Sequence, residues 1–292
     1  MSYEIKQLRL FPFKSLKGIE LDECQIDEYG FRYDRIYILV NRGSTGYKAV
    51  TQRSDPVMAL ISQKLERDKL VLSYEDKSQQ KQCVELPLDI TAWPVDLPNI
   101  EMELWGHPFT GLDVGSSEIK EFFLDFFEQF GKHKFTPENL TVVVSKTHRS
   151  IDDNGLDVVP SFQDIYPGSL MTTESFADLE EHVGFIEEDA KINMDSFRMN
   201  ILIATDEPWI EDDWKKIEIS GHKWVVPTVT GRCTMPAVDQ DSGQTRKNKH
   251  PLPSLNRFRV LEKGAKPCFG ISLHNEDANY KIRVGDLVKV IE

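Results

Sequence analysis

Residues 3–10 read YEIKQLRL, and this alternation of apolar and polar side chains is typical of a half-buried β-strand. Residues 11–18, FPFKSLKG, interrupt the pattern with a proline and a glycine, so a loop should follow the strand. Similar short apolar segments recur along the chain between turn residues. They are residues 19–26, 34–40, 70–74, 100–104, 200–203, 224–226 and 282–290. Many short strands separated by turns predict a barrel or a folded sheet.

The clearest predicted helix covers residues 117–130. Its apolar side chains recur at three- and four-residue intervals, and five of them are phenylalanines. This spacing places them in one stripe, which we expect to face the core. Ser116 or Ser117 can cap the start of the helix, and Gly131 can end it.

A second helix is predicted at about residues 173–183, capped by Thr172 and closed by Gly184. Before it, residues 146–168 carry two prolines and few periodic apolar positions, which predicts a long loop. A loop of that length inside a compact domain is usually functional or disordered. The fold class is therefore predicted as α+β and predominantly β, with a division near residues 145–165.

The composition of the 292-residue chain is that of an ordinary globular protein, with 40% hydrophobic and 28% charged residues. No apolar run approaches the roughly 20 residues needed to span a bilayer, and the N-terminus lacks the layout of a signal or transit peptide. We therefore expect no membrane span, and a location in the cytoplasm or at the periphery of mitochondria. The net charge of −13 argues against a general nucleic-acid binder, because phosphate repels such a surface.

Cys233 is the most informative of the four cysteines. The other three are Cys24, Cys83 and Cys268, and no two of the four form a CxxC pair. Free thiols in a reducing compartment are expected. Cys233 directly follows Gly231 and Arg232 and precedes a polar turn at residues 238–243. A nearby guanidinium favours the thiolate, which is a soft ligand for a transition metal.

Several cationic and polar side chains lie where predicted strands begin or end: Lys14, Ser15, Arg35, Arg198 and Asn200. Loops at strand ends commonly carry binding groups. Together with Cys233 these residues could form a pocket that offers cationic donors to a phosphate and a thiolate to a metal. Taken one at a time, each of the positive charges is better explained by an ordinary surface salt bridge.

Seven short motifs occur in a fixed order: residues 11–18, 33–35, 197–200, 231–243, 251–252, 269–270 and 284–286. In this order they resemble the MOSC family with its N-terminal partner domain. Within that family the chain is similar to the mitochondrial amidoxime reducing component and its bacterial and fungal relatives. The resemblance implies an N-terminal β-barrel-like domain at residues 1–145 and a MOSC domain at residues 146–292. It also implies a MOSC-type β-barrel packed against a mixed α/β lobe.

The resemblance also implies roles for individual residues. Cys233 matches the cysteinate ligand of a pterin-bound molybdenum, the molybdenum–molybdopterin cofactor. The residues that match positions holding the pterin and its phosphate are Lys14, Ser15, Arg35, Arg198 and Asn200. Asp164, Ile165 and Tyr166 match a turn that lines the cofactor partly through its backbone. Gly231 and Arg232 match the turn that leads to the metal ligand.

The activity implied by the resemblance is a two-electron reduction that removes oxygen from amidoximes, hydroxylamines or N-oxides. The electrons would come from an external cytochrome b5-type protein with its reductase, or from a flavoprotein. Asp239 is a candidate proton donor to the departing water, although its position in a polar turn favours turn formation.

The chain departs from the family pattern where residues 235–237, Met-Pro-Ala, replace the Thr-Thr step of animal members. It also shows neither the membrane anchor of animal relatives nor the iron–sulfur domain of bacterial ones, so an external donor is expected. Three alternatives stay open. They are a cofactor carrier or sulfur-transfer protein without turnover, a hydrolase with Cys233 as nucleophile, and a structural partner protein.

Overall fold

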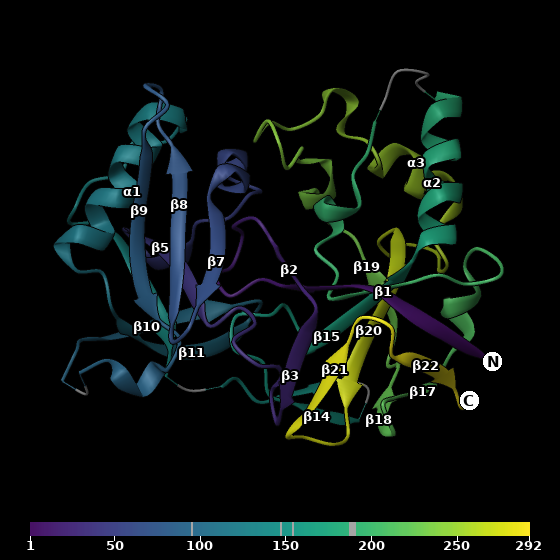
Figure 1. The fold of residues 1–292 in the computed structure, drawn as a ribbon. Coiled ribbons are helices and arrows are strands. Elements are labelled where there is room, and N and C mark those ends of the chain that lie inside the picture. Colours follow the sequence, from purple (N-terminus) through teal and green to yellow (C-terminus); the bar gives the residue numbers. More distant parts are fainter. Residues whose placement is uncertain (95, 147, 154, 187–190) are drawn as a thin grey trace.

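The computed structural model describes residues 1–94, 96–146, 148–153, 155–186 and 191–292. It contains two lobes of mainly β-structure, seen side by side in Figure 1. The expected α+β, predominantly β class is therefore confirmed. Among the described residues, no helix is long and apolar enough to cross a membrane.

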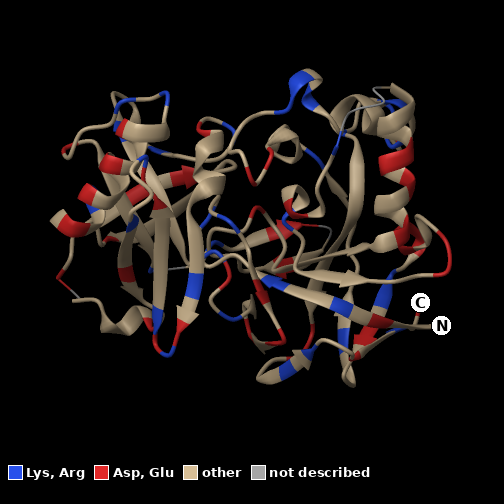
Figure 2. Cartoon of the chain, turned by 45° about the horizontal axis from the view of Figure 1, so that its top comes forward, with Lys and Arg blue, Asp and Glu red and all other residues tan. Residues whose placement is uncertain are grey.

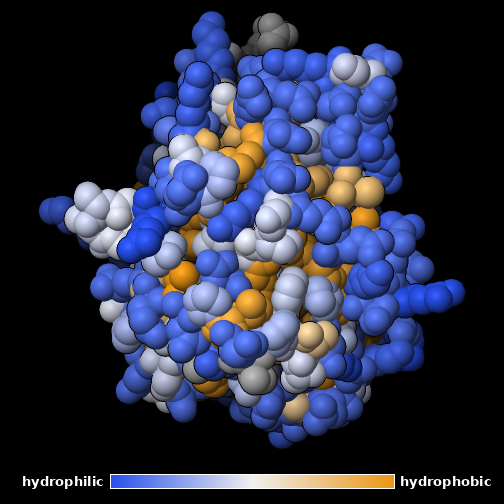
Figure 3. Space-filling model, turned by 90° about the vertical axis from the view of Figure 1, so that its left-hand side faces the viewer, coloured by the Kyte–Doolittle hydropathy of each residue, from blue (hydrophilic) through white to orange (hydrophobic). Residues whose placement is uncertain are grey.

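The first lobe is built on a closed five-stranded barrel, in which the strands follow the order β10-β11-β12-β5-β6. Its strands are β5 (Tyr37–Gly43), β6 (Gly46–Ala49), β10 (Asn99–Leu104), β11 (His107–Asp113) and β12 (Leu140–Ser145). A three-stranded sheet lies beside it, made of β7 (Ser62–Glu66), β8 (Lys69–Glu75) and β9 (Lys81–Pro87). The outer face of this lobe is largely hydrophilic, with hydrophobic side chains visible across its middle (Figure 3).

The second lobe is built on a larger sheet, which closes into a ring of seven strands because β15 pairs with β20. The ring contains β1 (Ser2–Leu10), β15 (Gly168–Thr172), β16 (Ile201–Ile203), β17 (Lys216–Ile219), β18 (His222–Val225), β20 (Cys268–Asn275) and β22 (Leu287–Val290). Two further strands attach to it, β2 (Ile19–Leu21) and β19 (Val229–Gly231). A small sheet of β3 (Glu23–Asp27), β4 (Gly30–Phe31) and β21 (Tyr280–Arg283) also forms.

The first strand of the chain belongs to this second ring. β1 pairs antiparallel with β16, with Leu8 opposite Ile201, and with β22, with Tyr3 opposite Val288. The chain then crosses to the first lobe. The division at residue 145 stays a prediction. In the sequence β1 precedes that position, whereas its pairing partners β16 and β22 follow it.

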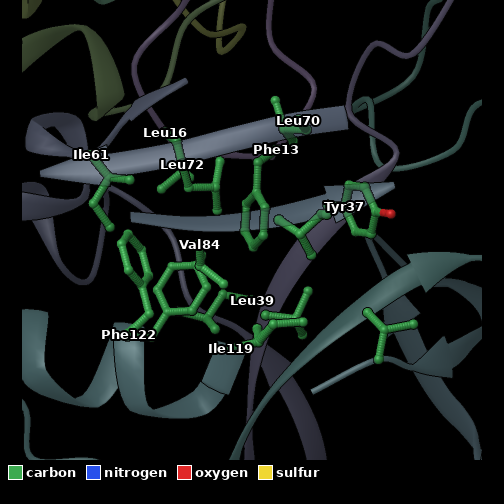
Figure 4. Packing of buried hydrophobic residues seen from close by; sticks show 14 of the residues in the cluster. Phe13, Leu16, Tyr37, Leu39, Ile61, Leu70, Leu72, Val84, Ile119 and Phe122 are labelled. Carbon is green, nitrogen blue, oxygen red and sulfur yellow. The ribbon is translucent and has the colours of Figure 1, made fainter. Parts of the chain in front are cut away.

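Helix α1 (Ser117–Phe130) forms where the stripe of phenylalanines predicts it. The Ser116 hydroxyl accepts a hydrogen bond from Ile119 N at 3.4 Å, and Gly131 follows the last turn, so both expected caps are present. Phe122 lies in one cluster with Leu72 and Val84 of the three-stranded sheet and with Phe13 and Leu16 from the loop after β1 (Figure 4).

Four predicted elements differ in the structure, the first being the strand predicted at residues 19–26, which is two strands, β2 and β3, in different sheets. Helix α2 (Thr173–Ile186) runs past Gly184 instead of ending there, although Thr172 does cap it. Within the predicted loop at 146–168, β13 (Ile151–Asp153) and β14 (Leu156–Val158) form a hairpin; residues 147 and 154 of that loop lie outside the described residues. The strand predicted at 282–290 is two strands, because Gly285 turns the chain with φ of 91°.

Candidate functional site

One cavity of about 480 Å³ is lined by residues of both lobes. It brings together every residue predicted to bind the cofactor: Lys14, Ser15, Arg35, Asp164, Ile165, Tyr166, Arg198, Asn200, Gly231, Arg232 and Cys233. These residues come from five separate stretches of the sequence. Their assembly in one cavity is a result of the fold, and their roles toward a cofactor stay predictions.

The loop after β1 is held at both of its ends. Leu8 and Leu10 are buried in the core of the second lobe, whereas Phe13 and Leu16 are buried in the core of the first. The polar residues between Phe13 and Leu16 therefore have little freedom to move, because the anchors on either side are fully packed. This explains how Lys14 and Ser15 are presented to the cavity.

Cys233 lies just beyond the end of β19, where Gly231 pairs with Cys268 of β20. Its side chain is partly exposed, and its sulfur accepts one weak hydrogen bond from Met235 N at 3.5 Å. The following residues form a short 3₁₀ turn, Met235–Ala237, in which Pro236 is buried. The thiol is therefore held at the cavity wall on a rigid turn.

Arg232 supplies a fixed positive charge beside this thiol. Its guanidinium donates to the carbonyls of Phe269 and Phe197, at 3.0 and 3.1 Å, which fixes its position. Burial lowers the pKa of Arg232 to about 10, while the nearby Cys233 acts in the opposite direction, so the group is still charged at neutral pH. Its donors are directed to these carbonyls and to Met199 Sδ rather than to the sulfur of Cys233.

Arg35 and Arg198 both lie on the ring of Phe11, with their Cζ atoms 4.5 and 4.4 Å from its centroid. Arg35 is neutralised by an ion pair with Asp34. Burial, and then the charge of Arg35, lower the pKa of Arg198 to about 9. Nη2 of Arg198 is buried without a hydrogen-bond partner among the described residues. A buried, charged donor without a partner is costly, so this nitrogen is suited to an anionic ligand.

Three residues of the cavity adopt left-handed backbone conformations although none is glycine. The φ angles are 68° at Ser15, 52° at Arg35 and 57° at Arg198. Such conformations cost about 1 kcal/mol or more each and concentrate at functional sites. The hydroxyl of Ser15 is, like Nη2 of Arg198, buried without a partner in the described part of the chain.

Lys14 and Asp164 form an ion pair at the cavity. Lys14 Nζ lies 2.7 Å from Asp164 Oδ1 and 2.7 Å from the carbonyl oxygen of Phe162. Burial lowers the pKa of Lys14, and Asp164 opposes that change. Burial would raise the pKa of Asp164, but the charge and hydrogen bond of Lys14 outweigh it and hold the pKa below its usual range. The Asp164 side chain is 66% exposed, so water screens part of this interaction.

Asn200 has a supporting role in the geometry. Its Oδ1 accepts from Ser169 Oγ at 3.0 Å and from Arg35 at 3.4 Å, and its Nδ2 donates to the carbonyl of Arg9 at 3.2 Å. With both ends of the amide used, Asn200 ties the start of β16 to β1 and β15 and orients Arg35.

Asp239 does not line the cavity. Its carboxylate accepts hydrogen bonds from the backbone of Asp241 and Ser242, at 3.2 and 2.8 Å, and pairs with Arg246 at 3.2 Å. Burial would raise its pKa, but these hydrogen bonds and Arg246 lower it. The structure thus gives Asp239 the turn-forming position, and its role as a proton donor stays a prediction.

The residues that line the cavity but were not predicted from the sequence include Arg53, Trp105, Asp153 and Lys266. Trp105 sits in the turn between β10 and β11, is 47% exposed, and donates from Nε1 to Asp164 at 3.2 Å. The Cζ atom of Arg53 lies 4.4 Å above its ring. The tryptophan in the turn between two strands was the feature that could have indicated this part of the site, because a large apolar side chain exposed to solvent often marks a binding surface.

No histidine is among the described residues that line the cavity, which weakens the hydrolase alternative. Nor does the described part of the chain contain a group of three His, Cys, Asp or Glu side chains placed to hold a metal ion.

Comparison with known proteins agrees with the two-lobed fold. Residues 2–129 match the MOSC N-terminal beta barrel domain, and residues 159–289 match the MOSC domain. The chain therefore belongs to the family of proteins in which a MOSC N-terminal beta barrel domain precedes a MOSC domain.

Two kinds of characterised relatives resemble the chain over nearly its whole length. It is 27% identical to the molybdenum cofactor sulfurase of Oryza sativa subsp. japonica over 94% of its own residues, but it spans only 32% of that protein. It is 26% identical to mitochondrial amidoxime-reducing component 1 of Mus musculus, covering 98% of this chain and 82% of that protein. The human mitochondrial amidoxime reducing component 2 is also 26% identical, with 97% and 82% coverage.

Proposed function

We propose that this chain is a molybdenum cofactor-dependent reductase that removes oxygen from N-hydroxylated compounds such as amidoximes, hydroxylamines and N-oxides. Its electrons would come from an external one-electron donor, a cytochrome b5-type protein with its reductase or a flavoprotein. One observation carries the proposal: a single cavity joins the Cys233 thiol to buried cations and to donor atoms that lack partners.

The cavity residues suit the chemical groups of such a cofactor. A pterin phosphate would accept hydrogen bonds from Nη2 of Arg198 and from the hydroxyl of Ser15, which have no partner among the described residues. Oε1 of Gln163 is buried without a partner as well and could accept from a pterin N–H group. Cys233, beside the charge of Arg232, offers the thiolate for the metal.

Removing oxygen from an N–OH group gives N–H and water, and it consumes two electrons and two protons. The molybdenum centre, when bound, would supply the electron pair. The chain's own residues would hold the cofactor, fix its orientation through Arg35 and Arg198, and provide a proton route. For the last task the hydroxyl of Tyr166, which is hydrogen-bonded to Asp153, lines the cavity.

The test is to produce the protein in a host that makes the cofactor and to compare Cys233→Ser with Cys83→Ser. Cys83 is an exposed thiol on β9 and serves as the matched control. Molybdenum, pterin and the reduction of a benzamidoxime by reduced methyl viologen are measured for each protein. Cys233→Ser should lose bound molybdenum and reduction, whereas Cys83→Ser should keep both. Wild-type protein that carries molybdenum stoichiometrically but reduces no N-hydroxylated compound would contradict the proposal.

The alternative function is a cofactor carrier or sulfur-transfer protein without turnover of its own. Its support is the similarity of nearly the whole chain to about a third of a molybdenum cofactor sulfurase. Cofactor bound through Cys233, with no reduction but with transfer to an apo-acceptor enzyme, would favour this function.

A further inference from the structure

We infer that residues 245–266, which we call the basic segment, form the docking surface for an acidic electron-donor protein. The segment contains the short 3₁₀ turn Lys247–Lys249, helix α3 (Leu252–Phe258) and the loop that leads to β20. The inference rests on the proposed function, because it names the partner class that would serve the cavity at Cys233.

The charge of the basic segment is opposite to that of the chain as a whole. It holds seven Lys and Arg residues and one Glu, a net charge of +6, whereas the complete chain carries −13. Five of these cations are exposed and form no ion pair with a described residue: Lys247, Lys249, Arg257, Lys263 and Lys266. The other two are used internally, since Arg246 pairs with Asp239 and Arg259 with Asp212.

Apolar side chains are exposed next to these cations. Val260 and Leu261 follow α3 and are 37% and 49% exposed, and Phe185 at the end of α2 is 84% exposed. The two helices are packed together, because His182 stacks on Phe258 at 4.0 Å and meets Phe185 edge-on at 6.3 Å. An apolar centre with a charged rim is the usual composition of a protein–protein interface.

The basic segment reaches the wall of the cavity. Lys266 lines the cavity together with Cys233, and its Cβ lies 3.5 Å from where a Cβ on Gly231 would be. The segment is also fixed to the strand beside the site, because Cys268 N donates to the carbonyl of Arg259 at 2.9 Å. A protein docked on this surface would therefore lie beside the proposed redox centre.

The surrounding surface would direct an acidic partner to this place. Asp and Glu residues are spread widely over both lobes, including α2 beside the basic segment (Figure 2). An acidic protein is repelled by that surface and attracted by the basic segment, so charge would select both its position and its orientation. A basic partner would be repelled by the basic segment and attracted by the acidic surface around it, so it is less suited to this site.

The test uses the soluble haem domain of an acidic cytochrome b5 as the probe and the triple variant K247E/K249E/K263E. None of these three lysines lines the cavity; Lys266 is left unchanged because it does. The matched control K77E/K132E/K134E makes the same change in charge at exposed lysines of the first lobe. Affinity is measured by calorimetric titration of the holoenzyme at low and at high salt, and reduction of a benzamidoxime is measured with the haem domain or methyl viologen as donor.

We expect the triple variant to raise the Kd and the KM for the haem domain about tenfold or more at low salt, and much less at high salt. Its activity with methyl viologen should equal that of the wild type, and the control variant should behave as the wild type throughout. Equal effects of the two triple variants, or a wild-type protein that does not bind the haem domain at low salt, would overturn the inference. So would a homodimer, or binding to anionic lipid vesicles, that the triple variant abolishes while affinity for the haem domain is unchanged. If no variant reduces the substrate with either donor, the proposed function fails, but the titrations still decide the docking surface.

Discussion

Replacing Glu211 with glutamine should remove a large pH dependence from the stability of the second lobe. Glu211 is fully buried in the turn Ile210–Asp213 and accepts a hydrogen bond from Ser175 Oγ at 3.0 Å. Burial raises its pKa from 4.5 to about 7, with Asp212 adding to the rise; the Ser175 hydrogen bond and the charge of Arg259 oppose it. The carboxyl therefore favours its neutral form in the folded protein.

The magnitude follows from the linkage between proton binding and folding. Between pH 4.5 and about 7 the folded state binds the proton of Glu211 more strongly than the unfolded state does. The free energy of unfolding therefore falls as the pH rises through this window and is constant above it. A pKa rise of this size corresponds to about 3 kcal/mol. Glutamine mimics the neutral carboxyl at every pH, so it avoids the loss.

Urea denaturation of the wild type and of Glu211→Gln, followed by tryptophan fluorescence at about pH 5 and about pH 8, measures this effect. Relative to the wild type, the variant should gain about 3 kcal/mol on going from the lower to the higher pH. Glu181→Gln, at an exposed carboxylate of α2, is the control and should show no such change. A difference between variant and wild type that is the same at both pH values would refute the reasoning.

Three further changes test the site and the core. Arg198→Lys should lower the pterin retained after gel filtration about tenfold, because lysine lacks the planar fork that binds phosphate; full retention would contradict the proposed phosphate contact. Trp105→Ala should raise the KM for an aromatic amidoxime about fivefold and leave kcat unchanged, as expected when an aromatic wall is removed; steady-state kinetics decide this, and an unchanged KM would exclude Trp105 from substrate binding. Phe123→Ala should lower the free energy of unfolding by about 3–5 kcal/mol, measured in urea, because it empties a fully buried position of the first core; a loss below about 1 kcal/mol would mean that the core closes around the gap.

The strands and the first helix could be predicted because their patterns are long and regular. β1 alternates over nearly its whole length, and α1 has a continuous stripe with Ser116 and Gly131 at its ends. Gly184 misled the prediction of α2 because a glycine inside a helix costs only about 1 kcal/mol, which tertiary packing can offset. The hairpin of β13 and β14 has strands of three residues each, which is too short for periodicity to be visible.

Some residues of the site could likewise be predicted from the sequence, and others could not. Cys233 and the cations near it belong to short motifs, so the sequence could indicate them before the fold was known. Arg53 and Trp105 belong to no motif; Trp105 reaches the cavity on the β10–β11 turn, and Arg53 reaches it from the loop that follows β6. The use of Asn200 as a brace, with both ends of its amide bonded, also could not be read from the sequence, since its partners come from three distant segments.

The position of β1 has a consequence for the order in which the molecule can be made. This strand leaves the ribosome before all the other strands of the ring, whereas its neighbour β22 is translated after all of them. Until β22 has emerged, the edge of β1 that pairs with it has no partner strand, and the second ring cannot close. A fragment that begins at residue 146 would lack β1, so its ring would be open between β16 and β22. Adding a peptide of residues 1–10 to this fragment tests whether β1 can complete the ring when it is supplied as a separate chain.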